Sequence, residues 1–204
     1  MDAEGFWSGG NWIAPAADLF DADLSGDFLN GAELFGAYLS GANLTGASLV
    51  LADLTGAYLS KAKLPTANLA YTYFVAADLT EADLSASNLQ GARLDGACLA
   101  GVSLKGANLA YSSLRGANLR GANFYWAALT GATLTAANIT GANFASARFA
   151  GVTVGGLFDE HAMWPYELYA DEPLEEARWA LREAWKQVEQ KQKEAEEEPE
   201  DRAA

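Results

Sequence analysis

The sequence contains very few of the residues on which enzyme and metal chemistry usually depend. Among 204 residues there is one cysteine, Cys98, and one histidine, His161. A single cysteine excludes an intrachain disulfide and fits a reducing compartment, so we expect a cytoplasmic protein. The cysteine and histidine spacings typical of zinc sites are missing, as is a glycine-rich phosphate-binding loop, so we expect neither a metal nor a cofactor.

Three patterns that indicate particular partners are also missing. There is no run of about 18 apolar residues, so no membrane span is predicted. The N-terminal sequence MDAEGFWSGGNWIAPAADLF lacks a basic segment followed by an apolar stretch, so we expect no secretory signal. No basic stripe with interleaved aromatic residues is present, so we expect no direct binding of nucleic acid.

Neither of the two rare reactive residues is accompanied by a second catalytic group. His161 follows Asp159 and Glu160, but no nucleophile lies near it in the sequence, so a hydrogen-bonding role is favoured over acid–base catalysis. Cys98 has no obvious cation or second cysteine to activate it. We therefore predict no catalytic residues and a protein that is not an enzyme.

What the sequence does contain is a five-residue unit that repeats without a break. The unit is centred on leucine, with alanine two residues earlier, and it runs from a first centre at Leu19 to a last centre at Val154. Glycine is common two residues after the centre, and asparagine or aspartate is common one residue before it. A repeat of fixed period determines the architecture and must be interpreted before individual propensities.

Period five matches neither a helix nor a strand, but a short extended piece followed by a turn satisfies it. Three extended residues place the alanine and the leucine on the same, inward side, and we expect hydroxyls, carboxylates and phenols to face outward. Glycine then suits a turn with positive φ, and asparagine or aspartate can bond to the backbone near the turn. We expect the central residues to form an apolar core.

These units resemble the pentapeptide repeat family, as in ANLTG at 42–46, ADLTG at 52–56 and ANITG at 137–141. The resemblance implies an all-β solenoid, a right-handed quadrilateral β-helix with four units per coil and thus about seven coils. It also implies a core ladder at every fourth unit, made of Leu24, Leu44, Leu64, Leu84, Leu104, Phe124 and Phe144. Segment 157–165 is also similar to the stretch that follows the last coil in many bacterial members. Some members mimic B-form DNA and bind type II topoisomerases.

The flanking segments are expected to protect the ends of this rod, because open coils expose unpaired backbone and apolar side chains. We predict an N-terminal cap at 1–16, the β-helix at 17–156 and a C-terminal cap at 157–172. An amphipathic helix is predicted at 173–190, and it either caps the rod, lies along its side or forms a dimer. A disordered acidic tail follows at 191–204. The candidate contact residues of the helix are Leu174, Leu181, Trp185 and Val188.

Several outward positions of the repeat are unexpectedly apolar. Leu51, Tyr71 and Tyr111 replace the glycine after the centre, and they are separated by whole multiples of four repeat units. If four units form a coil, they share one corner of the rod, and apolar residues of the adjoining face extend the group. Exposed apolar patches mark contact sites more often than scattered residues do. The predicted interaction edge consists of Phe35, Leu51, Tyr71, Tyr73, Val75 and Tyr111, unless the C-terminal helix covers it or the residues are merely tolerated.

The charges are graded along the repeat. Residues 17–56 carry six acidic and no basic side chains, whereas residues 97–156 carry four basic and no acidic ones. The net charge of the chain is −14, most of it from residues 157–204. Such a gradient acts on how partners approach and orient.

The sequence therefore predicts a non-catalytic protein–protein interaction or scaffold module, with an unidentified protein partner or a second copy in a homodimer. The alternative is a DNA-mimicking gyrase-binding protein that protects against quinolone-like poisons. Against it, the acids are not spread along the rod, its last coils are basic, and no loop interrupts the repeat.

Overall fold

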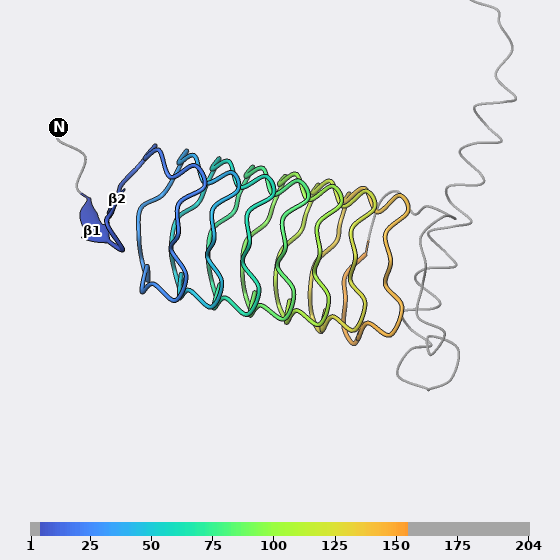
Figure 1. The fold of residues 1–204 in the computed structure, drawn as a ribbon. Coiled ribbons are helices and arrows are strands. Elements are labelled where there is room, and N and C mark those ends of the chain that lie inside the picture. Colours follow the sequence, from blue (N-terminus) through green and yellow to red (C-terminus); the bar gives the residue numbers. More distant parts are fainter. Residues whose placement is uncertain (1–4, 155–204) are drawn as a thin grey trace, which may run out of the picture.

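The computed structural model describes residues 5–154, and they form a rod of stacked coils (Figure 1). A short antiparallel hairpin stands at the N-terminal end, with β1 at Phe6–Ser8 and β2 at Asn11–Ile13. No helix occurs within 5–154, so none there is long and apolar enough to cross a membrane. The architecture is an all-β solenoid.

The backbone of each coil pairs with the next coil at a constant offset along the sequence. Parallel bridges join residue i to residue i+20, from Asp18↔Tyr38 to Thr133↔Thr153. The N–H of a central residue donates to a carbonyl of the next coil, as from Leu44 to Lys63 at 2.6 Å. Four five-residue units therefore make one coil, and every side of the rod is a column of residues i, i+20, i+40 and so on.

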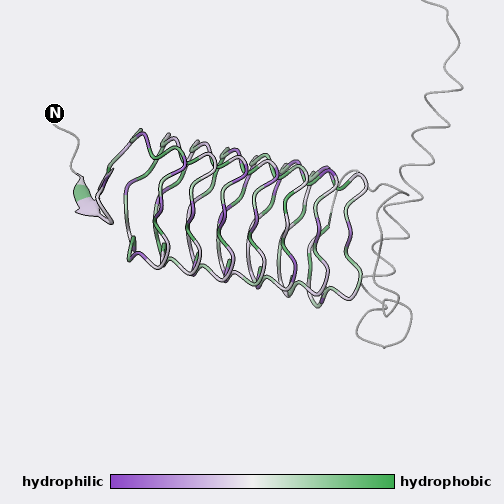
Figure 2. Ribbon diagram, in the orientation of Figure 1, coloured by the Kyte–Doolittle hydropathy of each residue, from purple (hydrophilic) through white to green (hydrophobic). Residues whose placement is uncertain are grey.

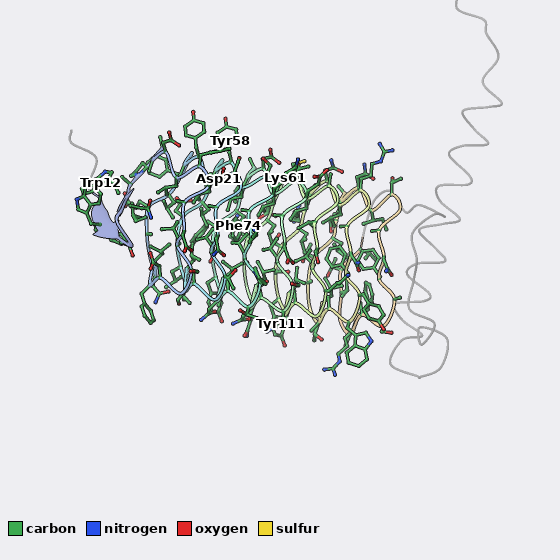
Figure 3. All side chains as sticks on the ribbon, viewed as in Figure 1. Trp12, Asp21, Tyr58, Lys61, Phe74 and Tyr111 are labelled. Carbon is green, nitrogen blue, oxygen red and sulfur yellow. The ribbon has the colours of Figure 1, made fainter. Side chains whose placement is uncertain are left out.

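The inward side chains of the units fill the rod from end to end. The predicted ladder of Leu24, Leu44, Leu64 and its successors has no solvent exposure. Two of its members, Phe124 and Phe144, stack with ring centroids 4.6 Å apart. Figure 3 shows Phe74 within the coils, and Figure 2 shows hydrophilic and hydrophobic residues alternating along each of them. Each coil is buried only against its neighbours. The stability of the rod is therefore approximately a sum of terms for the single coils and for the contacts between adjacent coils.

Three polar residues replace the inward alanine at 72, 87 and 112, and all are buried. Each hydroxyl donates to a backbone carbonyl: Thr72 to Leu49, Ser87 to Leu84 and Ser112 to Leu109, at 2.7–2.8 Å. A buried hydroxyl is tolerated when it is hydrogen-bonded. The expectation that all hydroxyls face outward is therefore wrong at these positions.

The N-terminal hairpin explains the aspartate that replaces an inward alanine at Asp27. The hydroxyl of Ser8, at the end of β1, donates to the Asp27 carboxylate at 2.7 Å. Ile13 of β2 is buried in the core, whereas Trp7 is 70% exposed. The end of the rod is thus joined to the hairpin by both apolar packing and a polar contact. The predicted C-terminal cap, helix and tail lie outside the described residues.

Replacing Leu89 by Asp should unfold the rod, because Leu89 is fully buried in the middle of the core. An unpaired buried charge costs about 3–5 kcal/mol or more. Urea titration followed by circular dichroism measures the loss. Phe28→Asp, which changes a phenylalanine that is 83% exposed and lies outside the core, is the control and should keep the wild-type midpoint. Equal midpoints for Leu89→Asp and wild type would contradict the inward assignment.

Candidate interaction surfaces

All corners of the rod have the same left-handed backbone conformation. The residue two positions after each centre, from 21 to 151, has φ between 52° and 73°. The carbonyl of the central residue accepts a hydrogen bond from the N–H three residues later, as from Ala47 to Leu44 at 3.0 Å. This is the geometry of a type II turn, which favours glycine at its third residue. Glycine is therefore the unstrained choice, and any other residue there costs about 1 kcal/mol or more.

Bulky apolar side chains occupy this strained position three times on one corner. Leu51, Tyr71 and Tyr111 have φ of 61°, 58° and 60°. These residues are 58%, 52% and 68% exposed, so more than half of the surface of each stays in contact with solvent. Residues 31, 91, 131 and 151 occupy the same corner and are glycine, which shows that the fold does not need a side chain there.

Each tyrosine of this corner lies over the glycine of the following coil. A Cβ atom placed on Gly91 would stand 2.5 Å from Cε1 of Tyr71. A Cβ atom on Gly131 would stand 2.6 Å from Cδ1 of Tyr111. The absence of a side chain on these glycines therefore leaves the space that the tyrosine rings occupy. This pairing was not predicted from the sequence. Its signal there was a tyrosine followed, 20 residues later, by a glycine.

The adjoining face of the rod adds the remaining members of the apolar edge, by which we mean Phe35, Leu51, Tyr71, Tyr73, Val75 and Tyr111. Tyr73 pairs through its backbone with Asp53 in one neighbouring coil and Arg93 in the other. The Arg93 guanidinium carbon stands 5.9 Å from the Tyr73 ring centroid, and its Nε lies 3.5 Å from Asp95. Phe35 and Tyr73 are exposed, and Val75 is half-buried.

A second aromatic group lies on a different side of the rod. Tyr38 and Tyr58 stack in parallel with ring centroids 5.1 Å apart. A shallow hollow next to them is lined by Ala16, Asp18, Phe20 and Tyr38. Figure 3 places Tyr58 and Tyr111 on opposite sides of the rod. The predicted interaction edge does not include this group, and the sequence analysis also missed Phe20 and Phe28, which are 65% and 83% exposed.

The polar residues before each centre mainly support the backbone. The carboxylate of Asp23 accepts from the Ser25 backbone N–H at 3.1 Å and from the Asn43 amide at 3.0 Å. Hydrogen bonds from the Ser25 side chain and backbone, with that from Asn43, lower the pKa of Asp23. Asn68, Asn88 and Asn108 form a ladder of side-chain hydrogen bonds at 3.1 Å. These contacts join successive coils on the outside of the rod.

The residues considered for catalysis have structural surroundings where they are described. Cys98 is half-buried, and its sulfur lies 3.2 Å from the Thr80 hydroxyl and 3.8 Å from the Asn118 amide nitrogen. Within 5–154, no three histidine, cysteine, aspartate or glutamate side chains gather as metal ligands. His161 and the four candidate helix residues Leu174, Leu181, Trp185 and Val188 lie outside the described part of the chain.

The chain belongs to the pentapeptide repeat family. The family model for pentapeptide repeats, in 8 copies, matches residues 32–69, 66–101, 97–135 and 129–156. These matches together run over more than half of the chain and confirm the resemblance seen in the repeat units. No curated protein matches the sequence.

Solved structures of the same family are similar to the chain. HetL of Nostoc sp. strain PCC 7120, involved in heterocyst differentiation regulation, is 30% identical, covering 73% of this chain and 81% of that one, with a TM-score of 0.31. Rfr23 of Cyanothece 51142 is 32% identical over 55% and 63% (TM-score 0.33). A pentapeptide repeat protein from the Arabidopsis thaliana thylakoid lumen is 34% identical over 48% and 64% (TM-score 0.38). The chain spans less than two thirds of the length of the last two.

Replacing Leu51 by Gly should raise the free energy of unfolding by about 0.5–1 kcal/mol, because glycine adopts this φ without strain. Leu49→Gly, two residues earlier and fully buried, should instead lower it by about 3 kcal/mol or more. Urea unfolding of both variants provides the comparison. A loss of more than about 1 kcal/mol in Leu51→Gly would show that the Leu51 side chain stabilises the rod.

Proposed function

We propose that this protein is a non-catalytic interaction module whose contact surface is the apolar edge. One observation carries the proposal: three bulky apolar residues are held at left-handed corners with most of their side chains in solvent. Backbone strain that the fold does not require supports a hypothesis of function. The partner that we propose is a protein and not a membrane or nucleic acid, and a cytoplasmic location stays a prediction.

The energetics of the corner support this proposal. Glycine at 51, 71 and 111 would relieve about 1 kcal/mol or more at each position. Retaining leucine and tyrosine therefore keeps this conformational strain in the isolated chain. A partner that covers the three side chains would return about 25 cal/mol for each Å² of apolar surface removed from water.

The geometry of the tyrosines also favours binding. The rings of Tyr71 and Tyr111 lie against the glycine corners of the following coils, so their orientation is restricted before any partner arrives. A tyrosine supplies a large contact area and loses little rotamer freedom on binding. The Tyr73 ring is likewise held beside the Arg93 guanidinium. The apolar edge is therefore a pre-ordered surface.

Charge favours this function over topoisomerase binding by DNA mimicry. A DNA mimic needs acidic groups along its length, whereas the acids of the repeat gather in its first coils and residues 97–154 contain none. We also propose that the rod has about seven coils and is closed by a C-terminal cap and helix. A closed end would direct contacts to the sides of the rod.

Affinity capture tests the proposal with the full chain immobilised in lysate of its source organism. The variant combines Leu51→Gly, Tyr71→Gly and Tyr111→Gly, which removes the side chains and gives each corner its favoured residue. The matched control is Trp126→Gly, at a different corner with φ of 62° and 68% exposure. We expect a protein that is retained by wild type and control and lost with the triple variant.

Identical retention by all three chains would refute the apolar edge as the contact surface. A retained type II topoisomerase, together with protection of gyrase supercoiling from a quinolone, would instead support the DNA-mimicry alternative.

A further inference from the structure

We propose that the apolar edge binds a second copy of this chain, with the two rods side by side and antiparallel and a two-fold axis beside Tyr73. This inference rests on the proposed function and identifies its partner. It follows from the order of charges and side-chain sizes on the face that carries Tyr73.

The charges on this face change sign on either side of Tyr73. One column of bridged residues runs Glu33, Asp53, Tyr73, Arg93. Next to it runs a second column, two residues further along each unit, which contains Phe35, Thr55, Val75, Asp95 and Arg115. The face therefore carries one acid in each of its first two coils, Tyr73 and Val75 in the third, the Arg93–Asp95 pair in the fourth and an exposed Arg115 in the fifth.

Reversing the rod about Tyr73 brings opposite charges together. Asp53 and Arg93 are each one coil from Tyr73, on opposite sides of it, so Asp53 of one copy faces Arg93 of the other, and this contact occurs twice. Glu33 and Arg115 lie in the coils two steps from Tyr73, on either side of it, so these coils face each other and the two charges stand diagonally, in neighbouring columns. A parallel arrangement would keep the acids of the first coils at the same level in both copies, away from the arginines of the later coils, and like charges at one level are unfavourable.

Arg93 is suited to this shared role. Its Nε already lies near Asp95 of its own chain, at 3.5 Å, and its side chain is 58% exposed. A guanidinium has five N–H donors in a planar fork, so the contact with Asp95 leaves others for a second carboxylate. Asp53 accepts the Thr55 backbone N–H with one oxygen, at 2.9 Å, so a second carboxylate oxygen remains.

The sizes of the corner residues are complementary under the same operation. A two-fold axis in the plane of the interface, perpendicular to the rods, makes each corner face itself in reverse order. Leu51 then opposes Gly91, Tyr111 opposes Gly31, and Tyr71 opposes Tyr71. Gly91 is covered by the Tyr71 ring of its own copy, so Leu51 meets that ring near the axis, whereas Tyr111 meets the open corner at Gly31, where a Cβ atom would have nothing within 4 Å. Each contact occurs twice, as in an isologous interface. The same axis brings the Tyr73 and Val75 pairs of both copies to the centre.

Charge reversal tests the arrangement by sedimentation velocity on the full chain over a concentration series at low salt. Wild type should sediment as a dimer. Asp53→Arg and Arg93→Asp should each raise the dissociation constant about tenfold or more, since each change places like charges together at two symmetric sites. The double variant should return to within about threefold of wild type, because the opposite charges meet again.

The matched control is Asp83→Arg on another face. Asp83 occupies the same position in its unit and accepts the Ser85 N–H at 3.0 Å, so it loses the same local hydrogen bond as Asp53→Arg. It should leave the dimer unchanged. Within one chain, Tyr73 separates Asp53 from Arg93 in the column, so an intrachain contact does not explain rescue.

Cross-linking measures the position of the axis. In a Cys98→Ser background, Val75→Cys should form an interchain disulfide on mild oxidation, because the two copies of residue 75 meet at the axis. Thr135→Cys lies in the same column three coils away and should not cross-link. A parallel dimer would treat the two variants alike and cross-link both or neither, and either result would overturn the antiparallel arrangement.

The remaining outcomes separate this inference from the proposed function. A wild-type chain that stays monomeric up to about 100 μM, well above the micromolar dissociation constants of weak complexes, refutes the second copy. So does a dimer that is insensitive to Asp53→Arg and Arg93→Asp. In both cases a different protein lost from the Leu51, Tyr71 and Tyr111 triple variant would leave the proposed function standing. Unchanged retention by that variant would refute both.

Discussion

The structure depends on one constraint: a left-handed turn recurs at every fifth position and places each coil in hydrogen-bonding register with the coil before it. The turn closes a corner, and three extended residues span a side, so four units return the chain to its starting side. The neighbours of each inward leucine and alanine in the adjacent coils are then fixed. A change of the turn conformation at one corner would move every later side chain out of its column.

This register converts distance along the sequence into position on a surface. Residues i and i+20 become neighbours. The change of charge along the sequence therefore becomes a charge gradient along the rod, and the separate substitutions at 51, 71 and 111 lie on one corner of the apolar edge. The edge is significant because bulky apolar side chains, in place of glycine, occupy three of its left-handed corners. Leu51, Tyr71 and Tyr111 adopt the same φ as the glycines above and below them, and they remain exposed. The left-handed φ of this corner thus favours glycine, whereas contact with a partner favours a bulky apolar side chain.

Most of the interior was predictable from the sequence, because the period alone separates inward from outward positions. The pairing of residue i with residue i+20 followed from family resemblance and not from the residues themselves. The lean of Tyr71 over Gly91 was not predicted, because it depends on the direction in which a corner side chain points along the rod. The contact of Asp27 was not predicted, since its partner Ser8 belongs to the hairpin outside the repeat. Phe20 and Phe28 were missed because polar residues follow both of them in their columns, so the repeat showed no apolar group there.

The most direct test of this register is a nuclear Overhauser spectrum of the isotope-labelled chain. Parallel pairing of residue i with residue i+20 predicts interstrand contacts that link Asn68 with Asn88 and Asn88 with Asn108. It also predicts hydrogen-bonding distances between the side-chain amides of Asn68 and Asn88 and between those of Asn88 and Asn108. Contacts at any other spacing, or none between these residues, would contradict the stacked coil on which the surfaces depend.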